Sequence, residues 1–338
     1  MLPEAFRKRI EQQPHISSEE LFHALEEPSP ATIRMNRSKW DGDPLNSKPV
    51  PWCRDGFYLD VRPSFTLDPL FHAGCYYPQE ASGMFLEELF KQTMGDQRNI
   101  KVLDLCGAPG GKSTHLSSLS GKNGLLIANE VIKSRASVLA ENITKWGIPN
   151  VIVTQSDPSS FSKLAGFFDL ILVDAPCSGE GMFRDITAVN EWSEGNAGLC
   201  SERQKRILMD IWPALKENGV LVYSTCTFNP GENEENIKWL TGKHEADTIP
   251  LDISKFNGIT GIDYLGIYGY GFYPGRIKGE GFFISAIRKR SKLQELDPGR
   301  KCNCESSLTV KAKAVLKAWT RFSAENLIRL KNEIIFAP

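Results

Sequence analysis

The sequence predicts an α/β protein whose core is a mostly parallel, doubly wound sheet. Two observations indicate this fold: between residues 100 and 225, short apolar runs alternate with amphipathic segments, and a glycine-rich turn follows the first run. Parallel strands need crossover connections, which strand and helix alternation supplies. Open sheets of this kind bind ligands beyond the carboxyl ends of their strands. We therefore expect the functional residues just after Leu105, Ala128, Val173 and Ser224.

The first ninety residues are expected to form a small mixed α+β region. Ser17 and Ser18 are typical of a capped helix start, because acidic and apolar residues follow them. Residues 33–36 are expected to form a strand, and the proline-rich residues 44–52 a loop. A second helix is expected from Pro78, because proline suits a first helical turn.

The region from residue 100 onward is expected to supply the strands and helices of the sheet. Its predicted strands are 101–106, 124–129, 151–154, 170–173 and 220–224. Its predicted helices are 112–120, 134–146 and 201–218.

Composition excludes several classes of protein. The chain has 338 residues, 41% of them hydrophobic and 24% charged, which is typical of a soluble globular protein. No apolar run approaches the roughly 18 residues that span a bilayer, so we expect no membrane contact. The first residues lack the apolar stretch of a secretory signal. Eight cysteines in such a chain therefore indicate reduced thiols and a cytoplasmic location.

The net charge of −1 hides an uneven distribution of charge. From Arg288 to Pro338 there are twelve basic and five acidic residues, which gives this tail a net charge of +7. Polyanions respond to local patches rather than to totals, so nucleic acid is a candidate partner. Solvated helix faces and a linker explain most such runs, so the tail alone does not decide.

A glycine-rich turn, Cys106 to Lys112 in the segment DLCGAPGGKS, joins the first predicted strand to a helix. Glycine lets the backbone approach a ligand closely, and a helix start offers unpaired N–H groups. A phosphate loop needs glycine where Cys106 stands, and a dinucleotide fingerprint needs glycine where Pro109 stands. An ATPase or a dehydrogenase is therefore disfavoured.

S-adenosylmethionine fits this turn better, because it carries an adenosine and an amino-acid tail but no phosphate. Glu130 ends the second strand, where an acid can accept both ribose hydroxyls. Asp157 follows the third strand and can bind the adenine amino group. Each acid alone is explained by a helix cap or a solvated loop, but their recurrence after successive strands favours a nucleoside site.

Two cysteines follow two further strands, Cys177 in DAPCSG and Cys226 in STCT. The ends of neighbouring strands meet at one edge of an open sheet, so both thiols can face one cleft. A buried free cysteine is usually only a small hydrophobic residue. That interpretation suffices for Cys53, Cys75 and Cys200.

A thiolate, a carboxylate and a methyl donor together suit methylation of carbon 5 of a cytosine. Carbon 5 is too weak a nucleophile to attack a sulfonium methyl directly. If a thiolate adds to carbon 6 while an acid holds nitrogen 3 protonated, the ring becomes an enamine that can attack. The thiol needs a pKa below its usual value of about 8.5, and Lys112 is the nearby cation.

The segments LDLCGAPGGKS, ANE, DAPCSGEGMF and STCT, with IRMN and HAGCYYPQEASGM before them and KGEGFF after them, resemble the Sun-family RNA cytosine-5 methyltransferases. The resemblance runs from about Ile33 to about Arg288. Within the family, it is strongest to the bacterial group that acts on small-subunit ribosomal RNA. It implies a Rossmann-like class I fold that depends on S-adenosyl-L-methionine, and an RNA substrate, 16S ribosomal RNA, free or within a 30S particle.

The resemblance also implies roles for individual residues. Cys226 would be the nucleophile, Cys177 would assist release of the methylated product, and Asp174 would hold the cytosine ring nitrogen near the methyl donor. The residues implied to line the cofactor are Cys106, Gly107, Ala108, Pro109, Gly110, Gly111, Lys112, Glu130, Asp157 and Asp174.

Several alternatives stay open. DNA cytosine methyltransferases use the cysteine of a Pro-Cys pair, which is Cys177 here, so the residues themselves do not choose between the two thiols. A tRNA or DNA substrate, or a catalytically silent RNA-binding scaffold, is also compatible with the sequence. The lack of a large target-recognition insertion argues against DNA, and the two thiols with an intact cofactor turn argue against a scaffold.

Two positions depart from the family pattern. Gly107 stands where alanine is common, and Tyr273-Pro274-Gly275 stands where Trp-Pro-His is common, so any contact of that histidine is absent. Phe183 and Trp192 are candidates for stacking on the target base. Aromatic residues in such segments are, however, more often part of the core.

Three domains are expected. Residues 1–95 would position RNA through phosphate contacts, residues 96–290 would form the catalytic domain, and residues 291–338 would form a basic linker and the start of a further RNA-binding element. Cys302 and Cys304 lack a second ligand pair at zinc spacing. We expect no metal, and a monomer.

Overall fold

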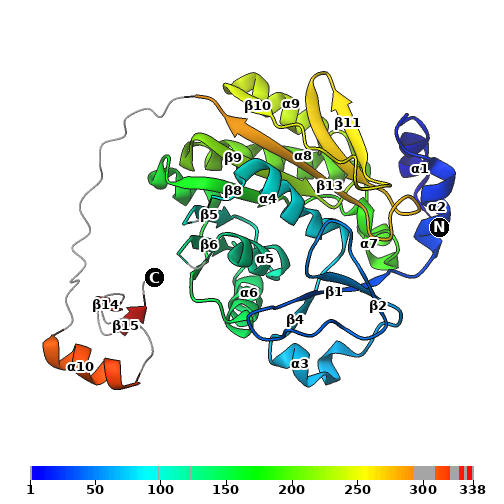
Figure 1. Cartoon of the computed structure of the whole chain (residues 1–338). Coiled ribbons are helices and arrows are strands. Elements are labelled where there is room, and N and C mark those ends of the chain that lie inside the picture. Colours follow the sequence, from blue (N-terminus) through cyan, green and yellow to red (C-terminus); the bar gives the residue numbers. More distant parts are fainter. Residues whose placement is uncertain are drawn as a thin grey trace.

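The structure is a computed structural model that describes residues 2–97, 99–121, 123–291, 309–319, 327–330 and 333–336. Within these residues the centre of the molecule is a nine-stranded mixed sheet (Figure 1). Its strand order is β11-β12-β13-β9-β8-β5-β6-β7, and β10 pairs with β13. Strands β5 to β9 pair in parallel, which confirms the α/β prediction, and β10 to β13 extend the sheet in antiparallel pairs.

The parallel strands are β5 (Lys101–Asp104), β6 (Leu125–Asn129), β7 (Val151–Thr154), β8 (Phe168–Asp174) and β9 (Leu215–Thr225). The antiparallel strands are β10 (Ala246–Thr248), β11 (Thr260–Tyr264), β12 (Ile267–Phe272) and β13 (Phe282–Lys289). The helices of this region are α4 (Leu86–Met94), α5 (Gly111–Leu119), α6 (Lys133–Trp146), α7 (Ile186–Glu191), α8 (Glu194–Ile211) and α9 (Glu234–Lys243).

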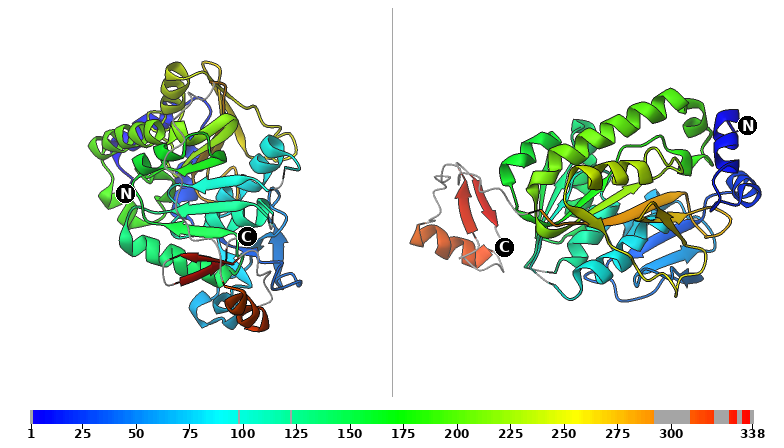
Figure 2. Two further views of the ribbon diagram at one scale, coloured as in Figure 1. Left: turned by 90° about the vertical axis from the view of Figure 1, so that its left-hand side faces the viewer. Right: turned by 90° about the horizontal axis from the view of Figure 1, so that it is seen from above.

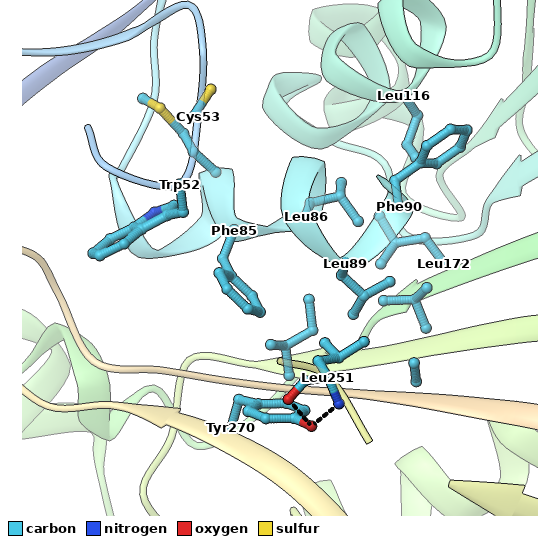
Figure 3. Packing of buried hydrophobic residues seen from close by; sticks show 14 of the residues in the cluster. Trp52, Cys53, Phe85, Leu86, Leu89, Phe90, Leu116, Leu172, Leu251 and Tyr270 are labelled. Carbon is cyan, nitrogen blue, oxygen red and sulfur yellow. Dashed lines mark hydrogen bonds between the residues drawn. The ribbon is translucent and has the colours of Figure 1, made fainter. Parts of the chain in front are cut away.

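Successive residues of each strand point to opposite sides of the sheet. Helices cover both sides, so side chains on both faces are buried. Val102 and Leu172 pack on one side with α4 and α5, whereas Leu103 and Val173 pack on the other with α8 and α9. Figure 2 shows helices on both sides of the sheet, and Figure 3 shows the packed face of α4. Strands buried on both faces have nearly continuous apolar runs, which is why the sequence reveals β5, β6, β8 and β9.

The amino-terminal region adds two helices and a small antiparallel sheet of order β2-β3-β1-β4. Its elements are α1 (Glu4–Glu11), α2 (Ser18–Glu26), β1 (Ala31–Met35), β2 (Ser47–Pro49), β3 (Gly56–Leu59), α3 (Pro69–His72) and β4 (Tyr76–Pro78). Arg34 of β1 joins this sheet to the start of α5: its side chain is buried and donates to the Gly111 carbonyl at 3.2 Å and to Thr114 Oγ1 at 2.6 Å.

Three sequence predictions of element boundaries are wrong. No helix begins at Pro78, because β4 ends there and α4 begins at Leu86 after a 3-10 turn. The Glu80 carboxylate accepts the N–H groups of Gly83 and Glu280, which holds the intervening turn in place. The helix expected over 201–218 is α8, which begins seven residues earlier, at Glu194. Ser193 caps its first turn, and residues 215–218 already belong to β9. The loop expected over 44–52 contains the short strand β2.

The carboxyl-terminal part contains α10 (Val310–Trp319), β14 (Leu327–Leu330) and β15 (Glu333–Phe336). β14 and β15 pair in antiparallel fashion. Cys302 and Cys304 lie outside the described residues. None of the described helices is both long and apolar enough to cross a bilayer. The division at residues 95 and 290 and the monomeric state stay predictions.

Gly275 occupies a backbone conformation that favours glycine. Its φ is +94°, and a Cβ atom there would lie 2.9 Å from the carbonyl oxygen of Glu20 in α2. The tripeptide that replaces Trp-Pro-His therefore forms a tight turn against the amino-terminal region.

We expect Gly275→Ala to lower the free energy of unfolding by roughly 1–3 kcal/mol, because a Cβ adds backbone strain and a close contact. Urea unfolding monitored by circular dichroism measures the change. The matched control is Gly198→Ala in α8, where a Cβ meets open space and helix propensity favours alanine. Equal effects of the two substitutions would contradict this explanation.

Asp104, at the end of β5, is a buried carboxyl group. It is fully buried, and burial raises its pKa to about 7, although the Ser113 hydroxyl donates to Oδ2 at 2.6 Å. The folded chain therefore holds the Asp104 proton more tightly than the unfolded chain does, where the pKa is about 3.9. The stability that this proton supplies is present below pH 4 and lost as pH rises towards 7.

Asp104→Asn should remove this part of the pH dependence. The free energy of unfolding of the variant, relative to the unsubstituted protein, should rise by a few kcal/mol between about pH 4 and pH 7. Urea titrations at several pH values in that range measure the difference. Asp60→Asn, at an exposed position, is the control; a constant difference for Asp104→Asn across the range would refute the assignment.

Candidate active site

Two cysteine sulfurs meet at the carboxyl ends of β8 and β9. The parallel register pairs Asp174 with Ser224, the neighbouring strand ends from which the loops carrying Cys177 and Cys226 depart. Their Sγ atoms are 3.1 Å apart, and the backbone N–H of Cys226 donates to Cys177 Sγ at 3.3 Å. Both residues are partly buried. The structure thus brings the two strand-end thiols of the sequence prediction into contact.

An ion pair lies at the same strand ends. Lys112 Nζ is 2.8 Å from Asp174 Oδ2, and Ser224 Oγ donates to Asp174 Oδ1 at 2.7 Å. Burial alone would lower the pKa of Lys112, but the charge of Asp174 and its hydrogen bond raise that pKa above its ordinary value. Lys112 therefore keeps its positive charge at neutral pH.

The glycine-rich turn lies between β5 and α5, as the sequence predicts. Gly110 caps α5 with φ at +117°, and the Gly107 N–H donates to the carbonyl of Asn129 at 2.7 Å. A Cβ at Gly107 would lie 2.7 Å from Ser113 Oγ. Gly107 stands where alanine is common in the family, and its lack of a side chain leaves room for the Ser113 hydroxyl. Cys106 packs with the cluster that contains Leu103 and Val173, and Ala108 packs with Ala128 and Leu139 of α6.

The two acids predicted to bind a nucleoside differ in their surroundings. Glu130 follows β6 and is buried; its Oε1 accepts the N–H of Ile132, whereas Oε2 has no hydrogen-bond partner among the described residues and lies 3.5 Å from Arg135 Nη1. Asp157 is exposed, and its Oδ1 accepts from the N–H and hydroxyl of Ser159. These bonds lower the pKa of Asp157. They make Asp157 the cap of the 3-10 turn that follows it, and a cap is the alternative to nucleoside binding that the sequence offers.

Glu232 holds the loop that carries Cys177, a role that sequence reasoning missed. It is fully buried and accepts the Ser178 N–H at 2.9 Å, the Ser178 hydroxyl and the Gln204 amide. Burial raises the pKa of this carboxyl group. The acidic segment in which it lies resembles an ordinary helix start, so no sequence signal separates Glu232 from its neighbours.

Glu180 holds the other side of the same site. Its buried carboxylate is paired with Arg9 of α1 and accepts the Trp192 indole N–H at 3.0 Å and the Phe228 N–H at 3.2 Å. Arg9 Nη1 also donates to the Phe228 carbonyl at 3.3 Å. Helix α1 thereby contacts the chain two residues after Cys226.

The prediction that Phe183 and Trp192 stack on the target base is not supported by their surroundings. Phe183 is buried, and its ring centroid lies 4.8 Å from that of Phe6. Trp192 packs on the same cluster and donates to Glu180. The alternative, that both aromatic residues belong to a core, describes their contacts because α1 and α2 cover this end of the sheet (Figure 1).

Comparison with known proteins extends over nearly the whole chain. Residues 91–288 match the family model described as 16S rRNA methyltransferase RsmB/F, and residues 2–81 match the N-terminal domain of 16S rRNA methyltransferase RsmF. Ribosomal RNA small subunit methyltransferase F of Klebsiella pneumoniae is 35% identical, over 88% of this chain and 66% of its own length. Its counterpart in Salmonella agona is 34% identical, over 96% and 71% respectively.

The chain spans about two thirds of the length of these relatives. Among solved structures, a methyltransferase homolog protein from Pyrococcus horikoshii is 30% identical, with a TM-score of 0.71 over 85% of this chain and 95% of its own. NSun6 from Pyrococcus horikoshii with SFG is 20% identical, with a TM-score of 0.71 over 86% and 99%, and shares the fold. From the family match over residues 91–288 and these relatives, the chain is a member of the RsmB/F family of 16S rRNA methyltransferases.

Proposed function

We propose that this protein transfers a methyl group from S-adenosyl-L-methionine to carbon 5 of a cytosine in 16S ribosomal RNA, through a covalent cysteine–cytosine intermediate. The observation that carries the proposal is the contact of two thiols, Cys177 and Cys226, at 3.1 Å beside the Lys112–Asp174 pair. Reaction at carbon 5 needs a nucleophile for carbon 6 and a group that helps the product leave. A thiol pair meets both needs, whereas a scaffold needs neither.

The residues around the glycine-rich turn fit the cofactor. S-adenosyl-L-methionine supplies an electrophilic methyl group when it is bound. Residues Cys106 to Lys112 would line it, and Glu130 would accept its ribose hydroxyls through Oε2, the buried oxygen that lacks a hydrogen-bond partner among the described residues. Asp174 would lie near the methyl group. Asp157 would contact the adenine amino group through Oδ2, because both of its bonds from Ser159 are accepted by Oδ1.

The protonation of the thiol pair favours Cys226 as the nucleophile. The hydrogen bond to Cys226, together with burial, raises the pKa of Cys177 well above its ordinary value. Cys177 therefore keeps its proton at neutral pH and can donate it to the neighbouring sulfur. Cys226 would then be the thiol that adds to carbon 6. After methyl transfer the carbon 5 proton leaves and the bond between carbon 6 and the Cys226 sulfur breaks, a release that Cys177 would assist.

Asp174 would hold the target base. Each of its oxygens already accepts one hydrogen bond, from Ser224 and from Lys112, and a carboxylate oxygen can accept a second. The carboxylate would accept a hydrogen bond from protonated nitrogen 3 of the cytosine and so maintain the protonated ring. Lys112 keeps Asp174 oriented while its own charge lies close to the reacting groups.

The family and the charge distribution support RNA as the substrate. The target base must be unpaired or flipped, because its two reacting carbons are covered within a stack. The amino-terminal region and the basic tail would bind phosphates, which orient RNA without reading its sequence. Ribosomal RNA places the reaction in the cytoplasm. DNA and tRNA are the alternative substrates that the experiment must separate.

Cys226→Ser should lower methyl transfer by at least about a thousandfold, the scale seen when a covalent nucleophile is removed, while cofactor binding is retained. Transfer of tritium from labelled S-adenosyl-L-methionine to 16S ribosomal RNA measures activity, and calorimetry measures cofactor binding. Cys75→Ala is the control, because Cys75 is a buried thiol of the amino-terminal region.

Cys177→Ala should instead accumulate a covalent RNA–protein adduct that survives denaturing gel electrophoresis, because release is impaired. If Cys226→Ser stays active and Cys177→Ser does not, the two roles are reversed. Equal transfer to DNA of the same sequence would exclude RNA specificity. No transfer to any nucleic acid by the unsubstituted protein would support a scaffold.

A further inference from the structure

Three buried side chains capable of binding a metal meet where the amino-terminal region packs against α4 and α5. Cys53 lies in the turn between β2 and β3, Glu87 in the first turn of α4, and His115 within α5. Their exposed fractions are 2%, 5% and 2%. Cys53 Sγ is 3.1 Å from Glu87 Oε2, His115 Nε2 is 3.2 Å from the same oxygen, and Sγ and Nε2 are 3.9 Å apart.

These separations suit one face of a tetrahedral metal site. Zinc binds sulfur at about 2.3 Å and nitrogen or oxygen at about 2.0–2.2 Å. Tetrahedral angles then place neighbouring ligand atoms roughly 3.3–3.6 Å apart. The three observed distances lie on both sides of this range, so small side-chain shifts bring all three atoms to one ion.

The two oxygens of the Glu87 carboxylate have different partners. Its Oε1 accepts hydrogen bonds from Lys91 Nζ at 2.7 Å and from the Arg54 N–H at 3.2 Å. Its Oε2 faces only Cys53 and His115 among the contacts of the described residues. Oε1 is therefore held by Lys91 and Arg54, while Oε2 is directed at Cys53 Sγ and His115 Nε2, the two other ligand atoms.

A cavity gives access to the cluster. Glu87 and His115 line a cavity of about 900 Å³, whose lining includes neither cysteine of the candidate active site nor Lys112 or Asp174. A water molecule from this cavity can fill the fourth position of a tetrahedral ion. His115 Nδ1 has no hydrogen-bond partner among the described residues, so only the Nε2 side of the ring is held.

We propose that Cys53, Glu87 and His115 bind one divalent cation of the zinc class, separate from the methyl-transfer site. Thiolate, imidazole and carboxylate ligands together select zinc over magnesium or calcium, which prefer oxygen alone. On binding, the thiol proton passes to solvent, and the imidazole proton moves from Nε2, where it faces Glu87, to Nδ1, which leaves Nε2 free to bind the ion. The proposed site differs from the expectation of no metal drawn from the sequence.

The ion would connect parts of the chain that are distant in sequence. Cys53 belongs to the segment matched by the amino-terminal family model, and His115 belongs to the methyltransferase segment. Helix α5 begins directly after the glycine-rich turn. The ion would therefore fix the start of α5 relative to the amino-terminal sheet, as a structural site rather than a catalytic one.

Cobalt binding tests the proposal on the full chain after removal of metal with a chelator. Titration with Co²⁺ should reach one equivalent per chain and produce the near-ultraviolet charge-transfer absorption that a thiolate ligand gives. Cys53→Ala should abolish that absorption. The double variant Cys177→Ser/Cys226→Ser should retain it, because the catalytic thiol pair is the competing site for a thiol-binding metal.

A thermal measurement distinguishes loss of the metal site from a folding defect in Cys53→Ala. Saturating Zn²⁺ should raise the melting temperature of the unsubstituted protein by about 5 °C, the shift that binding well above the dissociation constant gives. His115→Gln, whose amide can still donate to Glu87, should show no such rise. Absorption that survives Cys53→Ala, or disappears in the double variant, would overturn the proposal, as would an equal zinc shift in His115→Gln.

Discussion

The parallel pairing of β8 with β9 sets the positions of Asp174 and the two thiols in the candidate site. The register places Asp174 opposite Ser224, and the two loops that leave these residues bring Cys177 and Cys226 into contact. Side chains along a strand alternate between the two faces of a sheet, so a slip of one residue would turn Asp174 away from Lys112. The buried apolar runs on both faces make such a slip costly. The hydrophobic core therefore determines the geometry on which the proposed chemistry depends.

Buried carboxylates fix the loops beyond the strand ends. Glu232 lies beneath the Cys177 loop and Glu180 beneath the segment after Cys226, and each accepts at least three hydrogen bonds or ion-pair contacts. A buried charge is tolerated only where its hydrogen bonds are satisfied. These loops consequently have one conformation in which both carboxylates are paired. The thiol pair therefore gains its alignment from acids whose partners are groups of the protein itself.

The sequence reveals the parallel strands and the strand-end cysteines because both depend on local patterns. The strand predicted over residues 151–154 matches β7, since a short run of β-branched residues between polar segments needs no distant information. Contacts between distant residues leave no such pattern. Pro78 suits a strand end as well as a helix start, and the bond of Glu80 to Glu280 decides between them. Glu232 and the Cys53 cluster are likewise defined by partners tens of residues away.

The contacts between the first helix and the loop after Cys226 have a consequence for biosynthesis. Arg9 and Gln13 contact Glu180 and Phe228 across sequence separations of 171 to 219 residues. Such contacts form late, since closing long loops costs chain entropy before any contact compensates. On the ribosome, the first helix is made long before its partners emerge from the exit tunnel. The contacts of the first helix with Phe228 can therefore form only after residue 228 has left the exit tunnel.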